Sequence, residues 1–219
     1  AIMNGIVGGE LISPTLTFEA INQFASKTMK TNVVRVPMTK EIGIDLKTTG
    51  QMVNSKTNMV YLCNPNNPTG AIMNPKELEF FCKETSKKSI VFVDEAYHEY
   101  VMDKKYRSMV SLVNEGYDVL ISRTASKVHG LAGLRVGYAI STPKIIKRLN
   151  SYMNGSLNVV GLRGAIASYK DKRFQKFSIE KNNEGRTIVT DYLNKKGIEY
   201  LDSQTNFIFI KTGIDIKKF

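Results

Sequence analysis

The chain has 219 residues, of which 42% are hydrophobic and 23% are charged, a composition typical of a soluble globular protein with one large domain or one domain and part of a second. No apolar run approaches the roughly 20 residues of a membrane-spanning helix, and no basic segment leads into an apolar one at the N-terminus, so we expect neither a membrane protein nor a signal peptide. The formal net charge of +11 is compatible with nucleic-acid binding, but Lys and Arg are scattered and no dense basic block interleaves with aromatic residues, so we favour a solvated basic surface with a site for anions.

Short apolar runs alternate with longer amphipathic stretches in the first two thirds of the chain. We expect a helix over residues 75–87, because Asn74 is a good N-cap and Pro75 suits the first helical position. Several runs are apolar on both faces, as in strands covered by helices on each side. The pattern predicts a three-layer α/β/α sandwich with a mainly parallel sheet. The expected strands span residues 33–37, 58–63, 89–94, 117–122 and 136–141.

The pattern changes after Pro143. Helices are expected over residues 144–153, 162–169 and 172–195, with Gly197 as the C-terminal stop of the last one, and short strands over 198–201 and 206–211. We therefore expect a large domain over residues 1–170 and the beginning of a small α+β C-terminal domain over residues 171–219.

The two cysteines, Cys63 and Cys82, form no CxxC pair, and the chain has only two histidines. This usage indicates two reduced thiols in or near the core of a cytoplasmic protein, and we expect no metal site.

Candidate site residues follow two of the expected strands. The loop 64–70 contains two prolines, and a stiff loop can hold an amide side chain such as that of Asn67 in a fixed place, although it is also simply a good turn. Asp94 ends a buried apolar strand, where a carboxylate is costly unless it meets a cation or strong donors. Tyr97 lies three residues further on and could reach the same cavity, whereas the plainer alternative for Asp94 is a helix N-cap.

A basic segment follows the expected strand 117–122. The hydroxyls of Thr124 and Ser126 stand beside Lys127 and resemble an anion site. A desolvated lysine has a depressed pKa and can form Schiff bases, although most loop lysines are merely exposed. Eight residues after Lys127, Arg135 lies in a glycine-rich segment, and its planar guanidinium suits a phosphate.

Taken together, these segments resemble the fold-type I pyridoxal-phosphate (PLP) dependent aminotransferases of class I/II, and within them the histidinol-phosphate aminotransferases. The resemblance spans about residues 6–211 and rests on the order Asn67, Asp94, Tyr97, Lys127 and Arg135, each near a strand end. It implies an enzyme that uses PLP to transfer an amino group between an amino acid or an amino-phosphate like histidinol phosphate and a 2-oxo acid. It also implies a cytoplasmic homodimer that binds neither nucleic acid nor a membrane.

The resemblance assigns catalytic roles to three residues. Lys127 would form a Schiff base with the PLP aldehyde and then act as the general base. Asp94 would pair with the pyridine nitrogen and keep it protonated, so that the ring can accept electrons. Tyr97, together with Asn67, would hydrogen-bond the 3-oxygen of the ring.

The resemblance also assigns the remaining cofactor contacts. Thr124, Ser126 and Arg135 would bind the phosphate. Phe18 stands where the family has an aromatic ring stacked on the cofactor, a place usually taken by Tyr in histidinol-phosphate aminotransferases. Phe keeps the stacking but not a phenol hydrogen bond.

The resemblance further predicts a fragment that lacks both ends. The family's glycine-rich phosphate turn usually lies upstream of residues 10–18, whereas residues 5–9 are typical of the lead-in to a strand. The arginine for the substrate carboxylate lies near the C-terminus in this family, beyond residue 219, and an N-terminal arm completes the partner subunit's site. We expect the parent protein to be an enzyme, and these 219 residues not to turn over substrate on their own.

Three alternatives stay open. Another PLP reaction, such as decarboxylation of threonine phosphate, would use the same cofactor ligands. A non-catalytic binding module could retain the PLP fold. A nucleic-acid-binding protein would show salt-dependent affinity for DNA or RNA.

Overall fold

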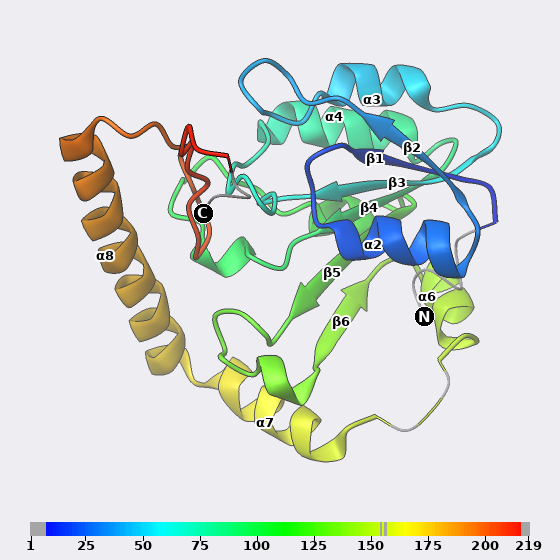
Figure 1. The fold of residues 1–219 in the computed structure, drawn as a ribbon. Helices are drawn as coiled ribbons and strands as arrows, with labels where there is room; N and C mark the ends of the chain where they lie inside the picture. The colour runs from blue at the N-terminus through cyan, green and yellow to red at the C-terminus, as the bar shows by residue number, and fades with distance from the viewer. Residues whose placement is uncertain (1–7, 154, 156, 216–219) are drawn as a thin grey trace.

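The computed structural model describes residues 8–153, 155 and 157–215, and its centre is a six-stranded sheet (Figure 1). The strands lie in the order β2-β1-β3-β4-β5-β6. β1 to β5 are parallel, and β6 pairs antiparallel with β5 at one edge. The predicted mainly parallel sheet is therefore confirmed. The strands are β1 (Glu10–Pro14), β2 (Asn32–Val36), β3 (Thr57–Cys63), β4 (Ile90–Asp94), β5 (Val119–Thr124) and β6 (Gly137–Ile140).

β1 is a strand whose bounds the sequence pattern does not give, although residues 5–9 are expected to lead into a strand. Of the expected lead-in over residues 5–9, only Gly8 and Gly9 are among the described residues, and they directly precede β1. Leu11 and Ile12 are buried on opposite faces of the sheet, each in a different core cluster. A run of five residues that ends in proline carries too short a pattern to be recognised by periodicity.

Helices cover both faces of the sheet, so the three-layer prediction is confirmed (Figure 1). The elements on one face are α3 (Leu46–Met52), α4 (Pro75–Thr85) and α5 (Val110–Asn114). The elements on the other face are α2 (Glu19–Gln23), the π-helical turn η1 (Phe24–Thr28) and α6 (Pro143–Asn150).

Alternate residues of the strands supply the two halves of the core. In β3, Val60 and Leu62 belong to the same cluster as Leu78 of α4, whereas Met59 and Tyr61 belong to the cluster that contains residues of α6. Full burial of one large apolar side chain stabilises the fold by roughly 1.5–3 kcal/mol. The sheet is thus held from both sides, which fixes the positions of its strand ends.

The start of α4 follows the predicted capping. The Asn74 side chain accepts hydrogen bonds from the backbone N–H groups of Lys76, at 3.0 Å, and Glu77, at 3.4 Å. Pro75 occupies the first helical position, where no N–H is needed. The helix ends at Thr85, two residues before the predicted end.

Two further helices follow α6. They are α7 (Val159–Lys170) and α8 (Lys172–Lys196), and α8 extends away from the sheet in Figure 1. Gly197 ends α8 with a left-handed backbone, φ 65°, so the predicted stop is confirmed.

The short strands predicted over residues 198–201 and 206–211 are wrong as strands. Only an isolated antiparallel bridge joins Tyr200 to Ile210. The pairing is limited to the two backbone hydrogen bonds of this bridge, from the N–H of Leu201 to the carbonyl of Phe209 at 2.9 Å and from the N–H of Lys211 to the carbonyl of Glu199 at 2.8 Å. The division into domains at residues 170 and 171 stays a prediction.

The segment around Ser203 and Gln204 docks on the loop after β3. The backbone N–H of Gln204 donates to the carbonyl of Gly70 at 2.8 Å, and its side-chain oxygen accepts from the backbone of Met102 at 2.9 Å. Gly70 has a left-handed backbone, φ 75°, and a Cβ added there would collide with the side chain of Ser203. A residue without a side chain is therefore required for this contact.

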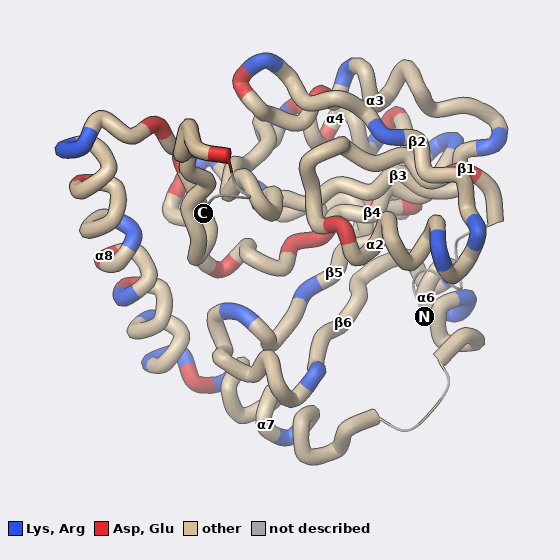
Figure 2. Tube along the Cα trace, viewed as in Figure 1, with Lys and Arg blue, Asp and Glu red and all other residues tan. Residues whose placement is uncertain are grey.

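Charged residues are distributed over the described trace, with Lys and Arg on helices and loops alike (Figure 2). Among the described residues, no helix combines the length and apolar character needed to cross a bilayer.

We predict that Gly70→Ala destabilises the fold more than Gly116→Ala. Both glycines have a positive φ, but nothing lies within 4 Å of a Cβ at Gly116, whereas Ser203 blocks one at Gly70. The left-handed backbone costs either variant about 1–2 kcal/mol, and overpacking adds about 1–3 kcal/mol at Gly70 alone. Urea denaturation measures both free energies of unfolding, and equal losses would contradict the docking of Ser203 on this loop.

Candidate active site

The carboxyl ends of β4 and β5 open into a cavity of about 430 Å³. Ligands of open α/β sheets bind at this edge, beyond the strand ends. Seven of the eight residues that the sequence singles out line the cavity, and the eighth, Asn67, contacts one of them. The lining residues are Phe18, Cys63, Asp94, Ala96, Tyr97, Ser122, Arg123, Thr124, Ser126, Lys127, Ala132 and Arg135.

Asp94 is the last residue of β4 and lies opposite Ser122 in the parallel register with β5. Its Oδ1 accepts hydrogen bonds from the Ser122 hydroxyl at 2.7 Å and from the backbone N–H of Ala96 at 3.2 Å. Its Oδ2 accepts from the Tyr61 hydroxyl at 3.3 Å. Burial raises the pKa of Asp94 and outweighs these hydrogen bonds, which lower it. A positive group placed in the cavity would therefore stabilise the ionised carboxylate.

Tyr97 lines the cavity and is hydrogen-bonded to Asn67. The Asn67 Nδ2 donates to the Tyr97 hydroxyl at 3.0 Å. Tyr97 is almost fully buried, and its ring meets the ring of Phe207 edge-on, with centroids 5.1 Å apart. The loop that carries Asn67 is anchored by Asn66, whose side chain accepts from the Thr17 hydroxyl at 3.0 Å. The phenol and the amide are thus held as a fixed pair of polar groups.

Lys127 lies in the turn that follows β5. Its Nζ stands 4.8 Å from the centroid of the Tyr97 ring, a cation–π contact. The charge of Lys127 also acts on Asp94, whose pKa it lowers. The amine therefore faces the same cavity as the carboxylate, which is the arrangement that the sequence predicts.

Two hydroxyls and a guanidinium also line the cavity. The Thr124 hydroxyl donates to the Ser126 Oγ at 2.8 Å and accepts from the Ser126 backbone N–H at 3.0 Å. Arg135 is exposed, and its Nη1 donates to the carbonyl of Ala132 at 2.8 Å. Its backbone is left-handed, φ 55°, a conformation that is uncommon outside glycine and concentrates at functional sites. This group of donors suits an anion such as a phosphate.

Phe18 forms a further wall of the cavity. It directly precedes α2, and 43% of its surface is exposed. An exposed aromatic ring at a cavity wall offers a face on which a flat ligand can stack.

The sequence interpretation misses three residues that hold the site together. Ser122 and Tyr61 donate to Asp94, and Arg123 forms an ion pair beside the cavity. A signal was present for Ser122, because it is a polar residue near the end of an apolar strand, as Asp94 is. The other two become recognisable only when the neighbouring strands are known.

The two histidines lie next to the site and not in its lining. His129 is buried, with its Nδ1 2.9 Å from the Ser168 Oγ and its ring centroid 4.1 Å from that of Tyr169. Burial lowers its pKa. The Nδ1 of His98 lies 2.9 Å from the carbonyl of Glu95. Both contacts are typical of histidines whose ring nitrogens are satisfied within the protein.

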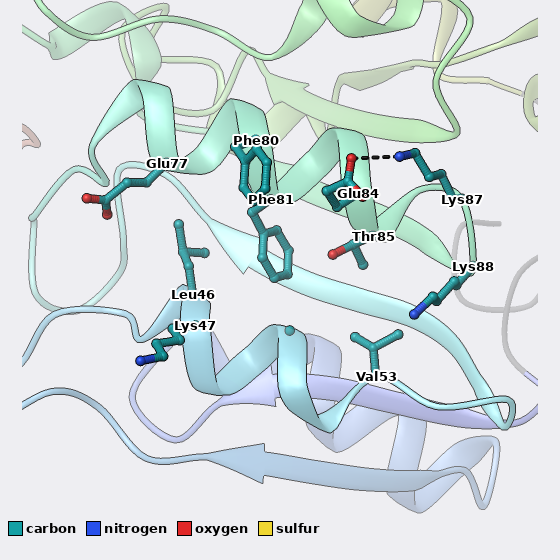
Figure 3. Close-up of a pocket in the computed structure, with 11 residues that line it drawn as sticks. Leu46, Lys47, Val53, Glu77, Phe80, Phe81, Glu84, Thr85, Lys87 and Lys88 are labelled. Atoms are coloured by element: carbon teal, nitrogen blue, oxygen red, sulfur yellow. Dashed lines mark hydrogen bonds and ion pairs between the residues drawn. The ribbon is translucent and has the colours of Figure 1, made fainter.

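A second concavity, of about 410 Å³, lies between α3 and α4 (Figure 3). Its wall is mainly apolar, with Phe81, Leu46 and Val53, and its Lys87 is paired with Glu84. Cys63 and Cys82 are buried free thiols, and within the described part of the chain no group of three or more His, Cys, Asp or Glu residues could hold a metal ion.

The cavity thus presents an amine, a carboxylate, a phenol with an amide, a set of anion donors and an exposed aromatic face. These groups could hold a flat, phosphorylated ring with a basic nitrogen and an aldehyde, because each finds a complementary partner. They fit PLP, the cofactor that the resemblance to the aminotransferases implies.

Comparison with known proteins agrees with this geometry. Residues 5–215 match the family model described as aminotransferase class I and II. The chain is 39% identical over 188 residues to a histidinol-phosphate aminotransferase of Brevibacillus brevis, a match that covers 84% of this chain and 50% of that protein. It is 34% identical over 212 residues to histidinol-phosphate aminotransferase 2 of Hydrogenovibrio crunogenus, covering 96% of this chain and 56% of that protein.

A solved structure gives the same result. The histidinol-phosphate aminotransferase of Sinorhizobium meliloti, in complex with pyridoxal-5'-phosphate, superimposes with a TM-score of 0.89 at 27% identity, over 98% of this chain and 59% of that one. The chain spans about half the length of the curated relatives it matches. The match of the family model over nearly the whole chain shows that the chain belongs to the aminotransferase class I and II family.

Proposed function

We propose that the protein is a PLP-dependent aminotransferase and that Lys127 is its Schiff-base lysine. One observation carries the proposal. Seven of the predicted cofactor ligands line a single cavity at the ends of β4 and β5, and the eighth, Asn67, contacts Tyr97. Membership of the aminotransferase family supports it further. When bound, PLP supplies an electron-accepting ring and an aldehyde that can take up and release an amino group.

Asp94 is the residue proposed to hold the ring nitrogen. Its carboxylate is costly to ionise in the buried site, as its raised pKa indicates. Pairing with a protonated ring nitrogen offsets this cost and in turn keeps that nitrogen protonated. Ser122 and Tyr61 orient the carboxylate through their hydroxyls.

Lys127 is proposed to carry the covalent link and to move the proton of the substrate. A lysine that stands against the face of Tyr97, near a carboxylate, is held in one place for both tasks. The Tyr97 hydroxyl, itself hydrogen-bonded to Asn67, is proposed to donate to the 3-oxygen of the ring.

The remaining ligands are proposed to fix the cofactor's phosphate and ring face. Thr124, Ser126 and Arg135 offer hydroxyl and guanidinium donors to the phosphate. Phe18 is proposed to stack on the ring.

The proposed substrates are an amino acid or amino-phosphate resembling histidinol phosphate as donor and a 2-oxo acid as acceptor. The names of the matched relatives from Brevibacillus brevis and Hydrogenovibrio crunogenus support the donor class. We further propose a homodimer in the cytoplasm.

The function is tested by supplying the full-length protein, loaded with PLP, with histidinol phosphate and no acceptor. The visible absorption of the cofactor should be replaced by that of its amine form, and 2-oxoglutarate should then restore it. Threonine phosphate serves as the control donor. Release of carbon dioxide from it, with no amine form from histidinol phosphate, would replace the aminotransferase proposal by a decarboxylase.

We predict that Lys127→Ala abolishes the visible absorption band that PLP gives with the wild-type protein. The matched control is Lys144→Ala, since the Lys144 side chain is 86% exposed and lies outside the cavity lining. Absorption spectra of the purified variants measure the effect. A band of unchanged strength in Lys127→Ala would refute the assignment of this lysine.

We predict that Asp94→Asn lowers the rate of transamination about 100-fold or more, because it removes a charge that no neighbouring group replaces. Ser122→Ala keeps the carboxylate and should cost about tenfold or less, the loss of one hydrogen bond. Steady-state kinetics distinguish the two variants.

The same carboxylate gives a pH dependence of cofactor binding. Burial raises the pKa of Asp94 above its ordinary 3.8, and binding of a positive ring requires the ionised form. The affinity for PLP should therefore fall as the pH drops through this raised pKa, and the fall should be smaller in Asp94→Asn. Equal pH dependence in both proteins, measured by fluorescence titration, would exclude Asp94 as the partner of the ring nitrogen.

A further inference from the structure

Glu95 is a buried carboxylate that none of the proposed roles uses. It directly follows Asp94, and its surface is 0% exposed. Both of its oxygens accept from the Ser108 hydroxyl at 2.8 Å, and Oε1 also accepts from the backbone N–H of Met109 at 2.9 Å. Its Oε2 accepts from the Arg123 Nε at 3.2 Å and Nη2 at 2.8 Å. A buried carboxylate without partners is strongly destabilising, and these donors offset the cost of burying Glu95.

The Glu95–Arg123 pair lies on the face of the sheet opposite to the side chain of Asp94. Side chains alternate between the two faces of a sheet, so Asp94 and Glu95 point to opposite sides. Asp94 bonds to Ser122, whereas Glu95 bonds to Met109, which belongs to the core on the α4 side. In β5, Arg123 lies between Ser122 and Thr124, so its side chain points to the face opposite to theirs.

The pair therefore ties the end of β4 to the end of β5 from the back. Glu95 is adjacent to Asp94, and Arg123 is four residues before Lys127 in the same continuous segment. The backbone adds one bond in the same place, from the N–H of Glu95 to the carbonyl of Ser122 at 3.0 Å. A shift of either side chain would move a strand end that carries a proposed cofactor ligand.

Arg123 contributes to the cavity wall, which raises the alternative that it binds an anionic substrate. Its guanidinium is already neutralised by Glu95 and also donates to the Ser108 hydroxyl at 2.9 Å. Arg135, in contrast, is exposed and donates to the backbone carbonyl of Ala132. Because only Arg123 is paired with a carboxylate, we assign anion binding to Arg135 and a positioning role to Arg123.

We propose that Glu95 and Arg123 form a positioning pair that sets the separation between Asp94 and Lys127, an inference that rests on the proposed PLP function. Two nitrogens of the planar Arg123 guanidinium donate to the Glu95 carboxylate, and the single ammonium group of a lysine cannot reproduce this geometry. The pair acts through the two strand ends, since the guanidinium that lines the cavity is already bound by Glu95.

The test compares Arg123→Lys and Glu95→Gln with the wild type, each as full-length protein loaded with PLP. Arg123→Lys keeps both charges and removes only the contact that two guanidinium nitrogens make with Glu95. We expect the pH midpoint of the cofactor's visible absorption to shift by about one unit, since it reports the surroundings of Lys127 and Asp94. We expect kcat to fall about 10-fold to 100-fold, because small misplacements of reacting groups are that costly, while KM stays within about threefold of the wild-type value.

Glu84→Gln is the matched control, because Glu84 and Lys87 form an exposed ion pair away from the cavity, at 2.6 Å. It should change neither the midpoint nor kcat. Thermal unfolding of the cofactor-free proteins separates stability from positioning, and if Glu95→Gln fails to fold, Arg123→Lys carries the test.

Several outcomes would overturn the inference. A midpoint and kcat equal to the wild type in Arg123→Lys would leave the pair a purely structural contact, even if the protein unfolds at a lower temperature. A rise in KM with kcat unchanged would make Arg123 a substrate-binding residue instead. If wild-type protein itself shows no band that depends on Lys127, the proposed function fails, and this inference fails with it.

Discussion

The parallel pairing of β4 with β5 is the constraint on which the candidate site depends. It places Asp94 opposite Ser122 and brings the segment that carries Lys127 to the same edge of the sheet. Parallel strands of this kind are buried on both faces, and one core cluster packs against each face of the sheet. The cavity is open at this edge because the strands end there, so the chemistry is located where the backbone ladder stops.

Two consecutive carboxylates show how alternation across a sheet separates structure from function. Glu95 turns to the α4 side and is neutralised by Arg123. Asp94 turns to the opposite side, accepts hydrogen bonds from neutral donors, and has its pKa raised by burial. The first is satisfied within the protein. The second gains stabilisation from a cationic ligand, which is the property that the proposed pairing with a ring nitrogen requires.

Features that depend on a few neighbouring residues were predictable from the sequence. The cap at Asn74 and the stop at Gly197 follow from local backbone requirements. The alternation of apolar runs with amphipathic stretches predicted the layers, since burial on two faces leaves a visible pattern. The strands predicted over 198–201 and 206–211 failed because apolar composition does not say whether a partner strand is present, and one bridge is all that forms there.

The sequence by itself determined the fold class, and it indicated that Asp94, Tyr97 and Lys127 share one site, because polar side chains after neighbouring strands of a parallel sheet lie at one edge. Phe18 was assigned only through the resemblance to the aminotransferases. Only the tertiary structure decided which groups hold those residues in place. The Tyr61 hydroxyl reaches Asp94 across 33 positions of the chain, and Arg123 reaches Glu95 across 28. Gln204 docks beside Met102 across 102 positions. Such contacts depend on strand order and register, which arise from packing of the whole chain and leave no local pattern to recognise.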